Sequence, residues 1–121
     1  MNKLIYKTFV FPNNPHTYRE RCSREASYER NQAGEDVFRD MGPLKREITG
    51  EGVFFGADAF DSFRRLVAVA EEDSPGNLQH PVWGIRYGYL TELEMTQEPR
   101  ENCVAYRFVF RQADSNGVLP K

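Results

Sequence analysis

The chain has 121 residues, a formal net charge of -2 and a hydrophobic content of 40%. This length suits one domain and is too short for two ordinary ones, and the apolar content supports a packed core, which excludes wholesale disorder. The most arginine-rich stretch, residues 19–30, alternates its arginines with glutamates. A surface that grips nucleic acid needs clustered positive charge, so this alternation predicts a solvated strand surface instead.

Neither a targeting signal nor a membrane-spanning segment is evident. Residues 1–11 lack the apolar stretch and cleavage site of a signal peptide, and no segment approaches the roughly 20 apolar residues that cross a bilayer. We therefore expect a cytoplasmic product without membrane association. In the cytoplasm, Cys22 and Cys103 are expected to stay reduced. The alternative is a disulfide between them, which requires the fold to bring their Cα atoms within about 7 Å.

The first third of the chain is predicted to form strands and one hairpin. Residues 4–11 carry apolar side chains on both sides of an extended strand, which ends at the turn formers of residues 12–15. Residues 24–39 are expected to form a projecting hairpin that turns at Asn31–Gly34, with a short strand over residues 36–41.

The middle of the chain holds one long strand and one helix. In the strand predicted over residues 44–55, Gly50 and Gly52 indicate a bend or a close approach of another backbone rather than a ligand site. A helix is predicted over about residues 58–72, and the Pro-Gly pair that follows is expected to end it. Its core-facing stripe recurs at helical spacing at Phe60, Phe63, Val67 and Ala70, and Ala59 and Leu66 widen it.

Aromatic residues alternate along two strands in the last third. The first strand is predicted over residues 82–95, with Trp83, Tyr87 and Tyr89 on one face that we expect to be buried against the helix. The second is predicted over residues 103–111. Its core face is lined by Val104, Tyr106, Phe108 and Phe110.

This order of elements predicts an α+β, β-rich fold. We expect an antiparallel split barrel or sandwich flanked by one α-helix, because a single helix can cover only one face or opening of such a sheet. Residues 1–113 are expected to form one domain, and residues 114–121 a flexible C-terminal tail.

The most individual segment, residues 76–84, follows the predicted helix. We interpret it as a rigid helix-to-strand corner in which the glycine after the helix takes a positive φ and the leucine packs beneath the helix end. The proline restricts the preceding histidine to an extended backbone, and its imidazole is expected to bond backbone carbonyls. The corner residues are Gly76, Leu78, His80, Pro81 and Gly84.

Nothing in the sequence indicates catalysis, a metal or a cofactor. The two histidines, His16 and His80, stand apart from any cysteine or carboxylate at ligand spacing. Residues 50–56 are one residue too long for a dinucleotide fingerprint and follow no βαβ pattern. The acidic pair Glu92 and Glu94 is typical of a solvated strand. We therefore expect no catalytic residues, no metal, no cofactor and no enzymatic activity.

The corner and its flanking strands resemble a known family, the N-terminal region of the Mu-like tail proteins labelled "DNA circularisation". These belong with the small tail and baseplate proteins of contractile-tailed phages. The resemblance covers roughly residues 44–111 and is carried by these stretches: Ile48–Gly56, Ala57–Ala70, the corner residues, and Tyr106, Phe108 and Phe110. It departs at Arg111-Gln112, where an acidic residue is more typical. The label does not imply DNA joining, because the chain shows no site for it.

The resemblance implies a tail-tube- or hub-like structural component of a contractile phage tail or phage-like particle. Such a baseplate hub or tube adaptor would be made in the host cytoplasm and reside in the virion. It would form a homo-oligomeric ring, expected to be hexameric, that contacts other tail tube and baseplate proteins while DNA passes through without specific binding. The expected subunit interface is the projecting hairpin, at Arg24, Tyr28, Arg30, Asp36, Phe38 and Arg39. The alternative is a soluble peptide- or carbohydrate-binding β domain that uses Trp83, Tyr87 and Tyr89 as an aromatic platform.

Overall fold

The computed structural model describes residues 3–24, 26–41 and 43–119, with backbone alone for residues 26–29 and 36–41. These ranges contain one helix, and the remaining elements are strands. In chain order the elements are β1 (Ile5–Tyr6), β2 (Phe9–Val10), β3 (Thr17–Ser23), β4 (Ala26–Arg30), β5 (Asp36–Met41), β6 (Lys45–Phe55), α1 (Ala59–Ala70), β7 (Gly76–His80), β8 (Gly84–Met95) and β9 (Cys103–Gln112).

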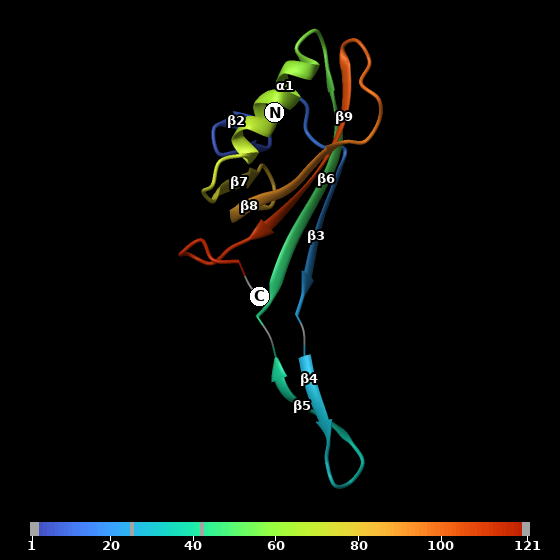
Figure 1. Ribbon diagram of the computed structural model, residues 1–121, viewed down its shortest axis with the longest axis vertical. Coiled ribbons are helices and arrows are strands. Elements are labelled where there is room, and N and C mark those ends of the chain that lie inside the picture. Colours follow the sequence, from blue (N-terminus) through green and yellow to red (C-terminus); the bar gives the residue numbers. More distant parts are fainter. Residues whose placement is uncertain (1–2, 25, 42, 120–121) are drawn as a thin grey trace.

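Seven strands form one antiparallel sheet in the order β2-β1-β7-β8-β9-β6-β3, and β4 and β5 form a separate two-stranded sheet. Helix α1 contacts β2, β6, β8 and β9, and so covers one face of the curled sheet (Figure 1). The predicted β-rich α+β fold, an antiparallel split barrel or sandwich flanked by one helix, is confirmed. In Figure 1, β4 and β5 extend beyond the ends of β3 and β6; we call these two strands and their loop the arm.

The centre of the core is the long ladder between β6 and β9, where small residues on one strand face large ones on the other. Gly50 lies opposite Phe108 and Gly52 opposite Tyr106. A Cβ at Gly50 would stand 2.5 Å from two ring carbons of Phe108, and one at Gly52 would stand 2.9 Å from the Cα of Pro15. The close approach predicted for this glycine pair is thus confirmed. The neighbours that come close are aromatic rings as well as backbone atoms.

Strand β8 pairs with two different strands along its length. Residues 84–88 pair with β7 and residues 88–95 pair with β9, so Gly88 belongs to both ladders. A side chain at Gly88 would collide with the carbonyl oxygen of Arg111. Glycine is therefore required where the sheet turns from one half of the barrel to the other.

The single strand predicted over residues 4–11 is wrong, because the chain reverses at Lys7, whose φ is +54°. The products are the two short paired strands β1 and β2. A continuous strand would send its even and odd positions to opposite faces. The reversal instead brings four large residues of both parities into the core: Leu4, Tyr6, Phe9 and Phe11.

Helix α1 is shorter than predicted, and its core-facing stripe is confirmed except at Phe60; Val67 and Ala70 are partly buried against the core. Ala59, Phe63 and Leu66 are buried, whereas Phe60 is 47% exposed and its assignment to the core stripe is wrong. The physical reason is that residues 59, 63 and 66 centre the apolar face and leave residue 60 at its edge.

The two cysteines lie far apart on different strands, Cys22 on β3 and Cys103 on β9. Cys22 is in register with Arg46 and Cys103 with Phe55, at opposite ends of β6. Nine residues of extended chain correspond to roughly 30 Å. This separation is too large for an intrachain disulfide, and both thiols are free.

After β9 the described chain forms a turn around Asp114. Its Oδ1 accepts hydrogen bonds from the N–H groups of Asn116 and Val118 at 2.8 and 2.9 Å. The Tyr89 hydroxyl donates to the carbonyl of Gly117 at 2.7 Å. The flexibility expected for residues 114–121, and the domain boundary at residue 113, stay predictions; residues 120–121 lie outside the described ranges.

Candidate functional site

The segment predicted as a helix-to-strand corner is a β-hairpin. Helix α1 ends at Ala70, several residues before the segment, so the chain is already in the sheet at Gly76. Gly76 begins β7 without a positive φ, and Gly84 begins β8 with φ +83°. Leu78 is fully buried in the core, as expected. The helix-to-strand assignment is therefore wrong, because residues 71–75 already form the connection.

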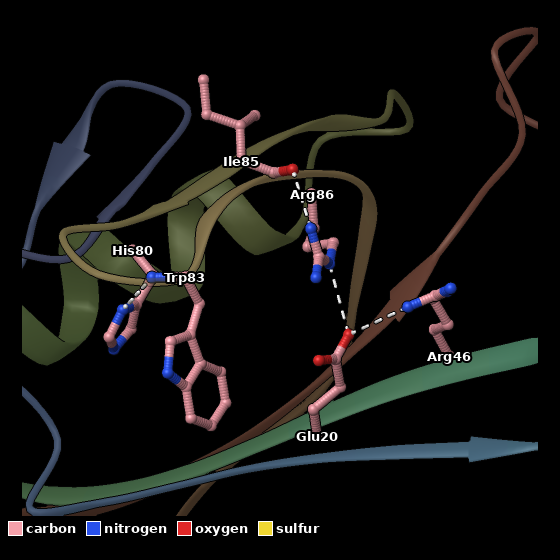
Figure 2. Close-up of polar contacts among 6 residues, drawn as sticks. All are labelled: Glu20, Arg46, His80, Trp83, Ile85 and Arg86. Carbon is pink, nitrogen blue, oxygen red and sulfur yellow. Dashed lines mark hydrogen bonds and ion pairs between the residues drawn. The ribbon is translucent and has the colours of Figure 1, made fainter.

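His80 holds the turn of this hairpin. Its Nδ1 accepts hydrogen bonds from the backbone N–H groups of Val82 at 3.0 Å and Trp83 at 3.1 Å. Figure 2 shows the second of these bonds. The expected bonding to carbonyls is wrong, since the ring atom is an acceptor. A neutral imidazole with its proton on Nε2 satisfies this geometry. Burial lowers the pKa of His80, which favours the same neutral form.

A contact between side chains brings together strands from the two halves of the sheet. The ring of Tyr18 on β3 lies 4.3 Å from the ring of His80 and 4.8 Å from that of Trp83, measured between centroids. Because β3 is at one end of the strand order and β7 is towards the other, this contact spans the opening of the curled sheet. Burial raises the pKa of Tyr18 to about 12.

An ion-pair network continues the same contact. Glu20 Oε1 on β3 lies 3.2 Å from Arg86 Nε on β8 and 3.7 Å from a guanidinium nitrogen of Arg46 on β6 (Figure 2). We call the six residues of the two clusters the seam: Tyr18, Glu20, Arg46, His80, Trp83 and Arg86. Side chains alone close the barrel there, since no backbone ladder joins β3 to β7 or β8 among the described strands.

The aromatic residues of β8 and its turn do not lie against the helix. Trp83 is 45% exposed and Tyr87 37%, so the expected burial against α1 is wrong. The strand places Tyr87 and Tyr89 on the face away from the core, opposite to Leu90. Trp83 instead packs against Tyr18 within the seam. The Tyr89 hydroxyl donates a hydrogen bond to the Gly117 carbonyl. The described structure shows no ring stacking among the three proposed platform residues.

The arm carries the residues expected at a subunit interface. Its register pairs Tyr28 with Phe38 and Arg30 with Asp36, and leaves Arg39 as the extra residue of a bulge. The backbone thus confirms the hairpin. Arg24 and Arg30 are exposed, whereas the side chains of the other four expected interface residues lie outside the described part.

The sheet also keeps an unpaired edge. Strand β3 has β6 as its one partner among the described strands, so the second edge of Thr17–Ser23 is free. On the outer face beside this edge, charges alternate from strand to strand. Arg107 lies 3.6 Å from Glu51 and 3.3 Å from Glu94, and Arg111 lies 3.4 Å from Glu47.

The described residues hold no group of three or more potential metal ligands among His, Cys, Asp and Glu. In the same part of the chain, no helix combines the length and apolarity needed to cross a bilayer. Tyr18, Glu20 and Arg86 were not anticipated as site residues. The sequence held one signal for the first two: residues 18 and 20 are two apart on one strand, so their side chains point to the same face of β3.

Three solved structures share the fold. The virion of a native gene transfer agent (GTA) particle contains a chain that aligns with TM-score 0.58 and 18% identity, over 93% of this chain and 92% of that one. A chain from the tail of an empty GTA particle with C6 symmetry aligns with TM-score 0.56 and 20% identity, over 84% and 78%. SPP1 Dit is described as a paradigm of the hub adsorption apparatus in phages that infect Gram-positive bacteria. It aligns with TM-score 0.68 and 17% identity. That match covers 93% of this chain but only 49% of Dit.

The architecture is therefore that of phage tail and hub proteins, a curled antiparallel sheet with one covering helix. The chain belongs to the family described as DNA circularisation protein N-terminus, whose model matches residues 16–87. This span starts earlier than the expected residues 44–111 and includes β3 and the arm, but it ends before the aromatic residues of β9. No curated protein sequence matches the chain.

Proposed function

We propose that this chain is a non-enzymatic structural subunit of a contractile phage tail or phage-like particle, a hub or tube adaptor that forms a homo-oligomeric ring around the DNA channel. The observation that carries the proposal is the arm. A two-stranded sheet that leaves the core has no packing partner of its own in the described chain, and isolated hairpins are marginal in water. A neighbouring subunit can provide the missing contacts.

The free edge of β3 supports the same proposal. Monomeric proteins usually cover or shorten such edges, because exposed backbone groups pair with other chains. A head-to-tail contact between one subunit's edge and a different surface of the next generates a ring when the rotation closes. Six subunits are the number we propose, since a structural neighbour comes from a tail with C6 symmetry.

The balance of charge suits a channel for DNA. The net charge is -2, and arginines on the outer sheet face are paired with glutamates. Where these pairs form, between β6, β8 and β9, the face leaves few unpaired cations to hold phosphates, so DNA would slide over it without specific binding. In this proposal the subunit resides in the virion, contacts other tube and baseplate proteins, and is made in the bacterial host cytoplasm.

Removing the arm tests the proposal. Ser23 and Lys45 form the last pair of the β3–β6 ladder, so an Asn-Gly turn in place of residues 24–44 would join them as a tight hairpin. We expect this variant to keep the unfolding transition of the barrel. Native mass spectrometry should then show rings for the full chain and monomers for the variant.

The matched control replaces the loop residues 31–35 by Asn-Gly and shortens the arm only at its tip. We expect it to retain weak self-association, because both arm strands stay. A full chain that is monomeric at every concentration, and that does not incorporate into purified tails, contradicts the proposed function.

A further inference from the structure

A groove lies at the base of the arm, where β3, β6 and β9 end. Its basic half is lined by cationic side chains from three strands: Arg21, Lys45, Arg46 and Arg111. Its apolar half adjoins the first and is lined by Pro43, Leu44, Val118 and Leu119. Arg46, Gln112 and Leu119 line both halves. Each half also contains one acidic residue, Glu47 in the basic half and Asp114 in the apolar half.

Charge in the basic half is not balanced within the chain. Arg111 is paired with Glu47, and Arg46 shares Glu20 with Arg86. Arg21 and Lys45 have no ion-pair partner among the described residues. Two cations without a partner within the chain are electrostatically complementary to a carboxylate from another chain.

A buried polar atom at the junction of the two halves indicates a peptide. The Oε1 of Gln112 is buried and has no hydrogen-bond partner in the described structure. Leaving such an acceptor unpaired is unfavourable, so a donor from a bound chain would stabilise the Gln112 amide once the side chain turns into the groove. A backbone N–H next to a carboxylate and an apolar side chain would fill the whole groove.

We infer that the groove receives the tip of the arm of a neighbouring copy, the tip being the loop of residues 31–35 and the first residues of β5 up to residue 38. The tip has this chemistry in its sequence, because Glu35 and Asp36 directly precede Val37 and Phe38. The carboxylate of Glu35, which is exposed, would enter the basic half, and the apolar stretch that follows in the sequence would reach the other half. This inference rests on the proposed ring and names the contact that closes it.

The tip is preorganised to be inserted. The Oδ1 of Asn31 accepts hydrogen bonds from the N–H groups of Ala33 and Glu35 at 3.0 and 2.9 Å, and Asn31 N–H donates to the Glu35 carbonyl at 2.8 Å. Glu35 is exposed at the end of this loop. A loop fixed before binding loses little conformational entropy on association.

The tip and the groove of one chain are separated by the arm itself. Five residues of β4 span roughly 17 Å at about 3.4 Å per residue, and the arm points away from the sheet (Figure 1). A chain therefore cannot fill its own groove without folding the arm back. A tip from the next copy gives a head-to-tail contact, which is the kind that forms rings.

Charge exchange in the full chain tests this contact. The groove variant combines Arg21→Glu with Lys45→Glu, and the tip variant combines Glu35→Lys with Asp36→Lys. We expect each variant to weaken association at least tenfold by analytical ultracentrifugation. A chain that carries all four substitutions should recover most of the wild-type association, since the opposite charges meet again.

Matched controls reverse the same numbers of charges elsewhere on the exposed surface. Arg64→Glu with Arg100→Glu controls for the groove variant, and Glu98→Lys with Glu101→Lys controls for the tip variant; all four residues are exposed. We expect wild-type association for both. Urea unfolding of every variant identifies those with altered folding.

Three outcomes contradict the inference. If the groove variant and the tip variant both still form rings of wild-type stability, this contact is contradicted but the proposed ring is not. Reversals that weaken association without recovery in the combined chain show that the groove and the tip do not meet. A wild-type chain that never associates contradicts the proposed function, and this contact with it.

Discussion

Replacement of His80 by alanine should destabilise the protein by an amount that depends on pH. The substitution removes the acceptor of two backbone N–H groups and the ring that contacts Tyr18. A neutral hydrogen bond contributes about 0.5–1.5 kcal/mol net. The lower end applies here, because Val82 is 80% exposed and water can replace the lost acceptor. The ring contact adds about 0.5–1.5 kcal/mol.

The expected loss at pH 7.5 is therefore about 2 kcal/mol. For a chain of this length that corresponds to a fall in Tm of roughly 6–10 °C. Urea unfolding followed by circular dichroism measures the free energy directly. His16→Ala is the matched control, because the side chain of His16 is exposed, and we expect it to change stability by less than about 0.5 kcal/mol.

The pH dependence follows from the lowered pKa of the folded His80. In the unfolded chain the imidazole takes up its proton near pH 6.5, whereas in the folded chain it does so only at lower pH. Between those two values the unfolded state binds more protons, so the contribution of His80 is complete above pH 6.5 and is lost as the pH falls through the folded pKa. The difference between wild type and His80→Ala should narrow between pH 7.5 and pH 5.

Two results would refute this reasoning. A difference between wild type and His80→Ala that stays constant from pH 7.5 to pH 5 would show that the neutral ring is not the stabilising form. A loss below 0.5 kcal/mol at pH 7.5 would show that the two turn bonds and the Tyr18 contact contribute little.

Two further predictions follow from the core and the seam. Gly50→Ala should cost about 1–3 kcal/mol in urea unfolding, because its Cβ would press on the ring of Phe108, and the cost should fall when Phe108→Leu is also present; an equal cost in both backgrounds contradicts the packing. The single tryptophan, Trp83, is 45% exposed, so its fluorescence should be partly accessible to iodide and acrylamide; a fully protected, blue-shifted emission contradicts the hairpin geometry.

The sequence predicted well the elements whose evidence is local. The second strand of the arm was placed at residues 36–41, where β5 lies, and the predicted strands at residues 44–55 and 103–111 differ from β6 and β9 by one residue at one end. Alternation of apolar and polar residues carries this information within a few positions. The close approach at Gly50 and Gly52 was predicted from the glycines themselves, because glycine inside a strand marks a bend or a close neighbour.

The errors arose where one residue or a distant contact decides the structure. The left-handed Lys7 reverses a segment whose composition is typical of a single strand. His80 lies 62 positions from Tyr18 along the chain, so their contact depends on how far the whole sheet curls. No local pattern reports that curvature, and Glu20 was therefore assigned to a solvated surface.

The seam has a mechanical consequence for a subunit that carries load. Strands β6 and β9 share a continuous ladder from residue 47 to residue 55, and a force along these strands must shear many hydrogen bonds together. The seam has a few ring contacts and a partly exposed ion pair, which can separate one after another. Under tension the barrel would therefore open first between β3 and the β7–β8 hairpin, while the ladder that connects the two halves stays closed.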